Sequence, residues 1–274
     1  PNGKVAAGGS SRSYDAVILA DGAYGRLHGL LNIGYRGSKL LGLNAVAEIK
    51  GELDRIVVDF SSRLSDGFFS WIVPVGGEAV IGTAARDPRA LKPKMHILAR
   101  SIGVKGFKRL YGGPVLTGPP AELLWRGRVF VVGDAGGLVK PLTGGGLYPN
   151  SVAASMATAI ADKEGDPAKA LREALCTVGR ELRAQHYIAR LFLSDKRVAG
   201  RAAALARIFK ADRALSGSID FDKHEDLPLA ALSSPARMAG VAVGILLDSP
   251  RALKSLAGYV ASLARSRLAP CKLH

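Results

Sequence analysis

The chain has 274 residues, of which 48% are hydrophobic, and this composition excludes an intrinsically disordered protein. Its formal net charge is +15, which fits either solubility alone or an anionic partner such as a membrane surface that attracts Lys and Arg side chains. Nucleic acid is not an expected partner, because no basic segment is interleaved with aromatic residues.

The first predicted element is the short apolar run at residues 14–20, which ends at Asp21-Gly22. This pattern predicts a buried strand of a parallel sheet followed by a tight turn. Strand-like stretches separated by turn signals such as Gly76-Gly77 come next, at residues 53–60, 67–75 and 78–83. They predict an antiparallel sheet, accompanied by one helix over residues 94–102.

The second half of the chain begins with another buried strand, predicted at residues 128–133 (RVFVVG). A glycine-rich loop follows from Asp134 to Gly146, and a helix of small residues is predicted over residues 150–162. Asp166-Pro167 has the N-cap and N1 residues of a long helix that reaches about residue 194. Ser249-Pro250 predicts the start of a further helix.

A metal site is not expected. The two cysteines, Cys176 and Cys271, lack CxxC spacing and an accompanying histidine cluster, and the sequence leaves open whether they form a disulfide. The longest uncharged apolar run, residues 238–247, is shorter than the roughly 20 residues that span a bilayer. We therefore expect a cytoplasmic protein that is peripheral to the membrane. Gln occurs once and Asn four times, and such scarcity of heat-labile amides favours a thermophilic source.

The strongest chemical signal lies where the second strand meets the glycine-rich loop. Gly133 permits close backbone approach, and Asp134 stands at the carboxyl end of the strand, where open α/β sheets bind ligands. A carboxylate at this place accepts hydrogen bonds from sugar or ribityl hydroxyls. Gly144-Gly145-Gly146 precede a helix, so bare N–H groups and the positive helix end point at the same crevice. This arrangement favours an electron-rich ring edge or an anion as the ligand.

Residues 133–150, GDAGGLVKPLTGGGLYPN, resemble the second flavin motif of FAD enzymes with the p-hydroxybenzoate hydroxylase type of fold. Within that group, the sequence of this segment is most similar to that of geranylgeranyl reductases. Aromatic hydroxylases usually have His two residues after the Asp, whereas this chain has Gly136. The resemblance implies FAD as the cofactor, with Asp134 on the ribityl chain and the backbone of Gly146 and Leu147 at the pyrimidine edge. The other motif positions that it implies at the cofactor are Gly133, Pro141, Gly144 and Gly145.

Two further segments carry the resemblance. Asp21-Gly22 resembles the Asp-Gly motif that contacts the pyrophosphate region of the cofactor, although Gly25 and His28 stand where related enzymes have Ser and Arg. Residues 68–74, FFSWIVP, resemble the Tyr-x-Trp-x-Phe-Pro stretch of the substrate sheet. This implies that Phe69, Trp71 and Pro74 bind the substrate near the flavin. Tyr148 is a candidate catalytic proton donor, and packing at the helix start is the other interpretation of this side chain.

The elements and the resemblance together predict an α/β fold. A partial FAD-binding Rossmann-like domain is expected at residues 1–40 and 121–165, an antiparallel substrate-binding domain at 41–120, and a helical C-terminal region at 166–274. The family begins with a Gly-x-Gly-x-x-Gly motif that binds the ADP pyrophosphate. No such pattern occurs in this sequence. We therefore expect a chain that is N-terminally truncated, or one whose missing segment is supplied by another chain.

The implied function is FAD-dependent reduction of carbon–carbon double bonds in geranylgeranyl chains of archaeal-type ether phospholipids. The enzyme is thus expected to be an oxidoreductase of isoprenoid lipid biosynthesis, with either NAD(P)H or ferredoxin as the external electron donor. Two alternatives stay open at this point. One is a flavin-dependent monooxygenase, and the other is an inactive fragment or subunit that needs the missing ADP-binding segment.

Overall fold

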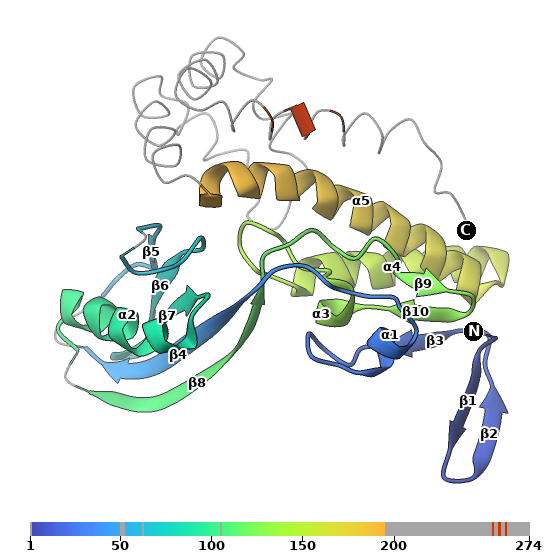
Figure 1. Ribbon diagram of the computed structural model, residues 1–274, viewed down its shortest axis with the longest axis horizontal. Coiled ribbons are helices and arrows are strands. Elements are labelled where there is room, and N and C mark those ends of the chain that lie inside the picture. Colours follow the sequence, from blue (N-terminus) through green and yellow to red (C-terminus); the bar gives the residue numbers. More distant parts are fainter. Residues whose placement is uncertain are drawn as a thin grey trace.

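The computed structural model describes residues 2–49, 53–61, 63–104 and 106–194, together with positions 254, 257, 258 and 261. Figure 1 shows two β-sheets side by side, with long helices along the smaller one. The chain enters the larger sheet through β4 (Lys39–Glu48) and leaves it through β8 (Phe107–Leu116). A separate antiparallel hairpin, β1 (Lys4–Ala7) with β2 (Ser10–Ser13), projects near the N-terminus.

The smaller sheet has the strand order β3-β10-β9. Strand β10 (Val129–Val131) runs parallel to β3 (Val17–Leu19) and antiparallel to β9 (Trp125–Arg126). All residues of β10 are buried, which confirms the buried strand predicted at residues 128–133. The burial predicted for residues 14–20 is wrong in part. Val17 and Leu19 pack against a buried cluster that includes Ile33, whereas Ile18 lies on the opposite face of this edge strand and is 53% exposed.

The larger sheet has the order β5-β6-β7-β4-β8, and every neighbouring pair is antiparallel. Its remaining strands are β5 (Val57–Asp59), β6 (Ser70–Val75) and β7 (Glu78–Ala85). The helix α2 (Pro88–Ser101) covers one face and buries Met95, Leu98 and Ala99 against the sheet. The antiparallel sheet predicted from the alternating stretches is therefore confirmed.

The other helices are α1 (Leu27–Leu30), α3 (Gly133–Gly136), α4 (Leu147–Glu164) and α5 (Pro167–Ser194). Helices α4 and α5 pack on one another and on Phe130 of β10, forming the core of this half of the molecule. The carboxylate of Asp166 accepts a hydrogen bond from the N–H of Lys169 at 3.0 Å, so the predicted start of α5 is confirmed. No helix among the described residues is both long and apolar enough to cross a membrane.

Several predicted boundaries differ from the structure. Helix α2 begins at Pro88 rather than at residue 94, because the Asp87 carboxylate caps it by accepting from the N–H of Arg89 at 2.9 Å. Helix α4 begins at Leu147 rather than at residue 150. Cys176, on α5, is disulfide-bonded. The helix predicted at Ser249-Pro250 lies outside the described residues.

Tyr35 connects the two sheets at the point where the chain crosses between them. Its side chain is 3% exposed. The hydroxyl donates to the Ser38 carbonyl at 2.6 Å and accepts from the Gly118 N–H at 2.8 Å, so it joins the entering and leaving crossovers. A Cβ atom at Gly137 would lie 2.3 Å from the Tyr35 ring, and this contact brings the glycine-rich loop to the same place. Tyr35 therefore fixes the sheets relative to the loop.

Replacing Tyr35 with phenylalanine is expected to lower the free energy of unfolding by about 2 kcal/mol, because the buried Gly118 N–H loses its hydrogen-bond partner and the Ser38 carbonyl loses one of its donors. Urea unfolding followed by circular dichroism measures the change. Tyr24→Phe is the matched control, since Tyr24 is 64% exposed. Equal stability of the two variants would contradict the role assigned to Tyr35.

Candidate functional site

The glycine-rich loop starts directly after β10. Gly133 has φ of +62°, a conformation that glycine adopts without strain, and Asp134 stands in the first turn of α3. The Lys140 N–H donates to the Gly145 carbonyl at 2.9 Å, and the Gly144 N–H donates to the Lys140 carbonyl at 2.8 Å. These bonds close the loop into a compact turn between the strand end and α4.

Asn150 holds the strand end and the helix start together. Its side-chain oxygen accepts from the Gly133 N–H at 2.8 Å. Its amide nitrogen donates to the carbonyls of Leu138 at 2.9 Å and Gly146 at 2.6 Å. One side chain thus bonds to the start, the middle and the end of the segment. The end of β10 and the start of α4, which the sequence predicts to face one crevice, are therefore both bonded to Asn150.

Unused hydrogen-bonding groups gather at this end of α4. Within the part of the chain that the structure describes, the backbone N–H groups of Gly145, Gly146 and Leu147 have no acceptor. The Thr143 hydroxyl is buried and also lacks a partner among these residues. A helix N-terminus carries partial positive charge. Three free donors and an orphaned hydroxyl fit an electron-rich polar edge such as that of a flavin ring.

The remaining predicted cofactor residues of this segment surround the same loop. Asp134 is partly exposed and Pro141 is buried. The Leu147 side chain is 92% exposed, so the backbone of this residue, rather than its side chain, belongs to the loop. Tyr148 follows directly and is partly buried in the first turn of α4.

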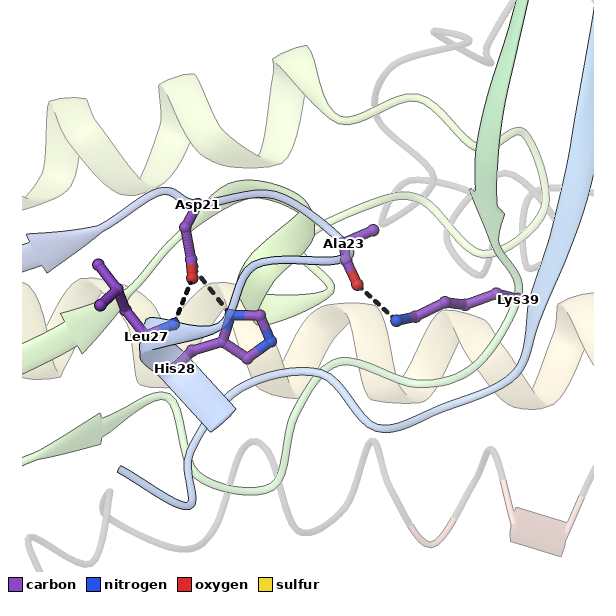
Figure 2. A network of polar contacts seen from close by, with 5 residues as sticks. All are labelled: Asp21, Ala23, Leu27, His28 and Lys39. Carbon is purple, nitrogen blue, oxygen red and sulfur yellow. Dashed lines mark hydrogen bonds and ion pairs between the residues drawn. The ribbon is translucent and has the colours of Figure 1, made fainter. Parts of the chain in front are cut away.

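Asp21 lies in a second polar cluster after β3, drawn in Figure 2. Its carboxylate accepts from the Leu27 N–H at 2.9 Å and pairs with Nδ1 of the buried His28 at 2.8 Å. Burial by itself would raise the pKa of the Asp21 carboxyl, but the hydrogen bonds from His28 and Leu27 outweigh it and lower that pKa. The carboxylate therefore orders the loop that contains Gly22.

The Asp21 turn and the glycine-rich loop share a small core. Ala23 packs in one buried cluster with Tyr35 and Val139, so residues from the two predicted cofactor segments are in the same place. The Ala23 carbonyl accepts from the Lys39 ammonium, which also lies 4.9 Å from the centre of the Tyr24 ring. The predicted cofactor residues are thus assembled along one side of the smaller sheet.

The predicted substrate residues divide between two faces of the larger sheet. Phe69 stacks on Phe68 with ring centres 4.1 Å apart and meets Trp71 edge-on at 5.8 Å. This aromatic cluster adjoins the glycine-rich loop, because a Cβ atom at Gly144 would lie 3.1 Å from the Phe68 ring. Pro74 is not part of it. Side chains alternate along a strand, and Pro74 pairs with Ala79 on the face that α2 covers.

Trp71 is positioned by the absence of a side chain at its cross-strand partner Gly82. A Cβ atom at Gly82 would lie 2.1 Å from the indole ring, whose N–H donates to the Asn44 side chain at 3.0 Å. We expect Gly82→Ala to displace the indole and to cost about 2 kcal/mol of stability. A shift of Trp71 fluorescence in a Trp125→Phe background measures the displacement. Gly113→Ala is the control, because a Cβ there meets nothing within 4 Å, and an unchanged Gly82→Ala spectrum would refute the assignment.

Comparisons with known proteins find similar sequences and similar folds. No family model matches the chain. It is 31% identical over 153 residues to digeranylgeranylglycerophospholipid reductase 2 of Methanothermobacter thermautotrophicus, covering 53% of this chain and 40% of that protein. It is 30% identical over 106 residues to digeranylgeranylglycerophospholipid reductase of Methanocaldococcus jannaschii, covering 35% and 27%. Over these segments the chain is therefore similar in sequence to two proteins named as digeranylgeranylglycerophospholipid reductases.

Solved structures support the fold of the chain. A geranylgeranyl bacteriochlorophyll reductase-like protein from Thermoplasma acidophilum superimposes with a TM-score of 0.51 at 21% identity, over 67% of this chain and 53% of that one. BrvH, a flavin-dependent halogenase from Brevundimonas, superimposes with a TM-score of 0.50 at 14% identity, over 96% and 58%. The predicted α/β flavoenzyme fold is confirmed. The matched segments cover less than half of each curated reductase.

Three residues that organise the candidate site have no distinctive signal in the sequence. Asn150 ends the recognised motif and starts the helix predicted over residues 150–162, and a lone Asn at a helix start carries no distinctive signal. The role of Tyr35 depends on contacts between residues far apart in the chain. Lys140 is 3% exposed beneath the loop, and its Cε atom would lie 3.0 Å from a Cβ at Gly145. A lysine in a loop ordinarily predicts exposure.

Proposed function

We propose that the chain takes part in FAD-dependent reduction of carbon–carbon double bonds in the geranylgeranyl chains of isoprenoid phospholipids. One observation carries the proposal: Asn150 holds the end of β10 and the start of α4 together, and unused donors collect between them. The names of the curated relatives support the lipid substrate. The flavin-dependent neighbours with this fold support the cofactor.

The residues present fit a bound flavin. Asp134 would accept hydrogen bonds from the ribityl chain, and the N–H groups of Gly145, Gly146 and Leu147 would face the pyrimidine edge. The Thr143 hydroxyl, buried without a partner among the described residues, would complete that edge. Asp21 and Gly22 would lie toward the pyrophosphate region. When bound and reduced, FAD supplies the hydride for the alkene.

The protein's own part is to bind and orient the lipid and to exclude water. An isolated alkene is a poor hydride acceptor, so the reaction needs a dry site in which the chain is held close to the cofactor. Phe68, Phe69 and Trp71 form an aromatic surface beside the glycine-rich loop that suits an isoprenoid chain. The Tyr148 hydroxyl is the proposed source of the proton that completes the addition.

The substrate also determines where the protein would work. Isoprenoid phospholipids reside in membranes, and a net charge of +15 favours association with an anionic surface. We therefore propose a peripheral membrane location on the cytoplasmic side. The external electron donor is either a nicotinamide nucleotide or a ferredoxin.

Anaerobic incubation with FAD, dithionite and a geranylgeranyl glycerophospholipid tests the proposal. Mass spectrometry is expected to find a gain of two hydrogens for each double bond reduced. Hydroxylated product or hydrogen peroxide in air would instead identify a monooxygenase. A purified chain that retains no FAD would identify a fragment that needs an additional ADP-binding segment.

A further inference from the structure

A cavity distinct from the glycine-rich loop lies at the junction of the two sheets. It has a volume of about 430 Å³ and is enclosed by the two chain crossovers, the end of β7 and the C-terminal half of α5. This junction pocket is defined by Ser38, Arg86, Thr117, Gly118, His186 and Arg190. Its size is within the range of pockets that bind small molecules, roughly 300–1,000 Å³.

The lining of the junction pocket is basic. It contains two guanidinium groups and one imidazole, and none of its described residues carries a carboxylate. Arg86 follows β7 and is exposed, with no ion pair or hydrogen bond to a described residue. Two acidic residues adjoin lining residues in the sequence, Asp87 next to Arg86 and Asp66 next to Gly67. Both form ion pairs with other side chains: Asp66 with Lys94 at 3.0 Å, and Asp87 with Arg89 at 3.1 Å. The positive charge of Arg86 is therefore not neutralised by either carboxylate.

His186 lines the same cavity and has an unsatisfied polar atom. Its Nδ1 is buried and has no hydrogen-bond partner among the described residues. Burial, and then the charge of Arg190, lower the pKa of the imidazole to about 4. The charged groups around it are Arg190 on its own helix and Arg86 from the end of β7. A buried polar atom without a partner costs free energy that a bound acceptor would recover.

We propose that the junction pocket binds a phosphate group, held by the guanidinium groups of Arg86 and Arg190 and by the imidazole of His186. Guanidinium groups match phosphate oxygens with paired N–H donors, and such charge-assisted bonds are the strong ones. Thr117, whose hydroxyl donates to the Ser38 carbonyl at 3.3 Å, also lines the cavity. The phosphate belongs either to a lipid headgroup or to a free phosphate compound. Only the first of these two sources rests on the proposed function.

Calorimetric titration of the full chain with glycerol phosphate and with inorganic phosphate tests the proposal. We expect saturable binding that weakens about tenfold in Arg86→Gln, as for the loss of one charge-assisted hydrogen bond. Arg89→Gln is the matched control, because the Arg89 side chain is 91% exposed and lies outside the pocket. Absence of saturable binding, or equal loss in the two variants, would overturn the proposal.

The ionisation of His186 gives a second readout that does not involve flavin. A bound anion stabilises the imidazolium, so the pKa of His186, followed by NMR, is expected to rise above about 4 when glycerol phosphate is added. This rise should be smaller in Arg86→Gln at the same ligand concentration. An unchanged His186 pKa at saturating ligand would count against the site.

The source of the phosphate is determined by comparing ligands. Tighter binding of glycerol phosphate than of inorganic phosphate assigns the pocket to a lipid headgroup, and equal binding assigns it to free phosphate. In the first case Arg86→Gln should raise KM for a geranylgeranyl phospholipid while leaving KM for geranylgeraniol unchanged. Binding without reductase activity would refute the proposed function but support the pocket, so the two failures are distinguishable.

Discussion

Replacing Asn150 with alanine is expected to abolish the organisation of the glycine-rich loop and to weaken FAD binding at least about tenfold. The Asn150 side chain bonds to Gly133, Leu138 and Gly146, so the variant loses three hydrogen bonds at once. At about 1 kcal/mol for each bond, the free energy of unfolding should fall by about 3 kcal/mol. Flavin fluorescence titration and urea unfolding measure the two effects.

Ser151→Ala is the matched control for this prediction. The Ser151 hydroxyl is exposed and bonds to the carbonyls of Leu147 and Tyr148 within its own helix, at 3.0 and 3.1 Å. Its removal should leave the loop, the FAD affinity and the stability nearly unchanged. If Asn150→Ala behaves like Ser151→Ala in both measurements, the strand end and the helix start are not held by this side chain.

Replacing Gly25 with alanine is the second change with a large expected effect. A Cβ atom at Gly25 would lie 2.1 Å from the Asp21 carboxylate and 2.6 Å from the Asp21 carbonyl. The carboxylate has little freedom to move, because it is bonded to His28 and to the Leu27 N–H. We expect a loss of about 3 kcal/mol in the free energy of unfolding. Thermal and urea unfolding measure it.

Gly29→Ala is the control for this clash, since a Cβ atom at Gly29 meets nothing within 4 Å. Acid unfolding adds a specific readout. Because the folded-state pKa of Asp21 is lowered, its contribution to stability is present above the ordinary aspartate pKa and is lost as the pH falls through the lowered value. This acid-dependent loss should be reduced in Gly25→Ala. Two variants with the same stability and the same acid dependence would rule out the packing described around Asp21.

The parts of the fold that sequence predicted have local signals. Val129–Val131 are apolar on both faces, as expected for a strand that is covered by helices on one side and by Ile33 and Ala135 on the other. The start of α5 was predicted because Asp166 and Pro167 satisfy a helix N-terminus by themselves. The glycine-rich motif was recognised as a whole because its residues are contiguous.

The parts that were not predicted depend on contacts between distant residues. Strands β4 and β8 pair with each other across the larger sheet, and their small and polar residues give a weak alternating pattern. Pro74 was grouped with Trp71 by resemblance, although strand alternation places the two on opposite faces of β6. The junction pocket had no sequence signal, since Arg86, Thr117 and His186 come from three separate segments.

The most direct test of the central claim is an NMR titration of the full chain with FAD that follows individual backbone amides. The account predicts that the largest chemical-shift changes occur at the backbone amides of Gly133, Gly145, Gly146 and Leu147. Changes confined to other parts of the protein, or no saturable change at all, would contradict a flavin site between the end of β10 and the start of α4.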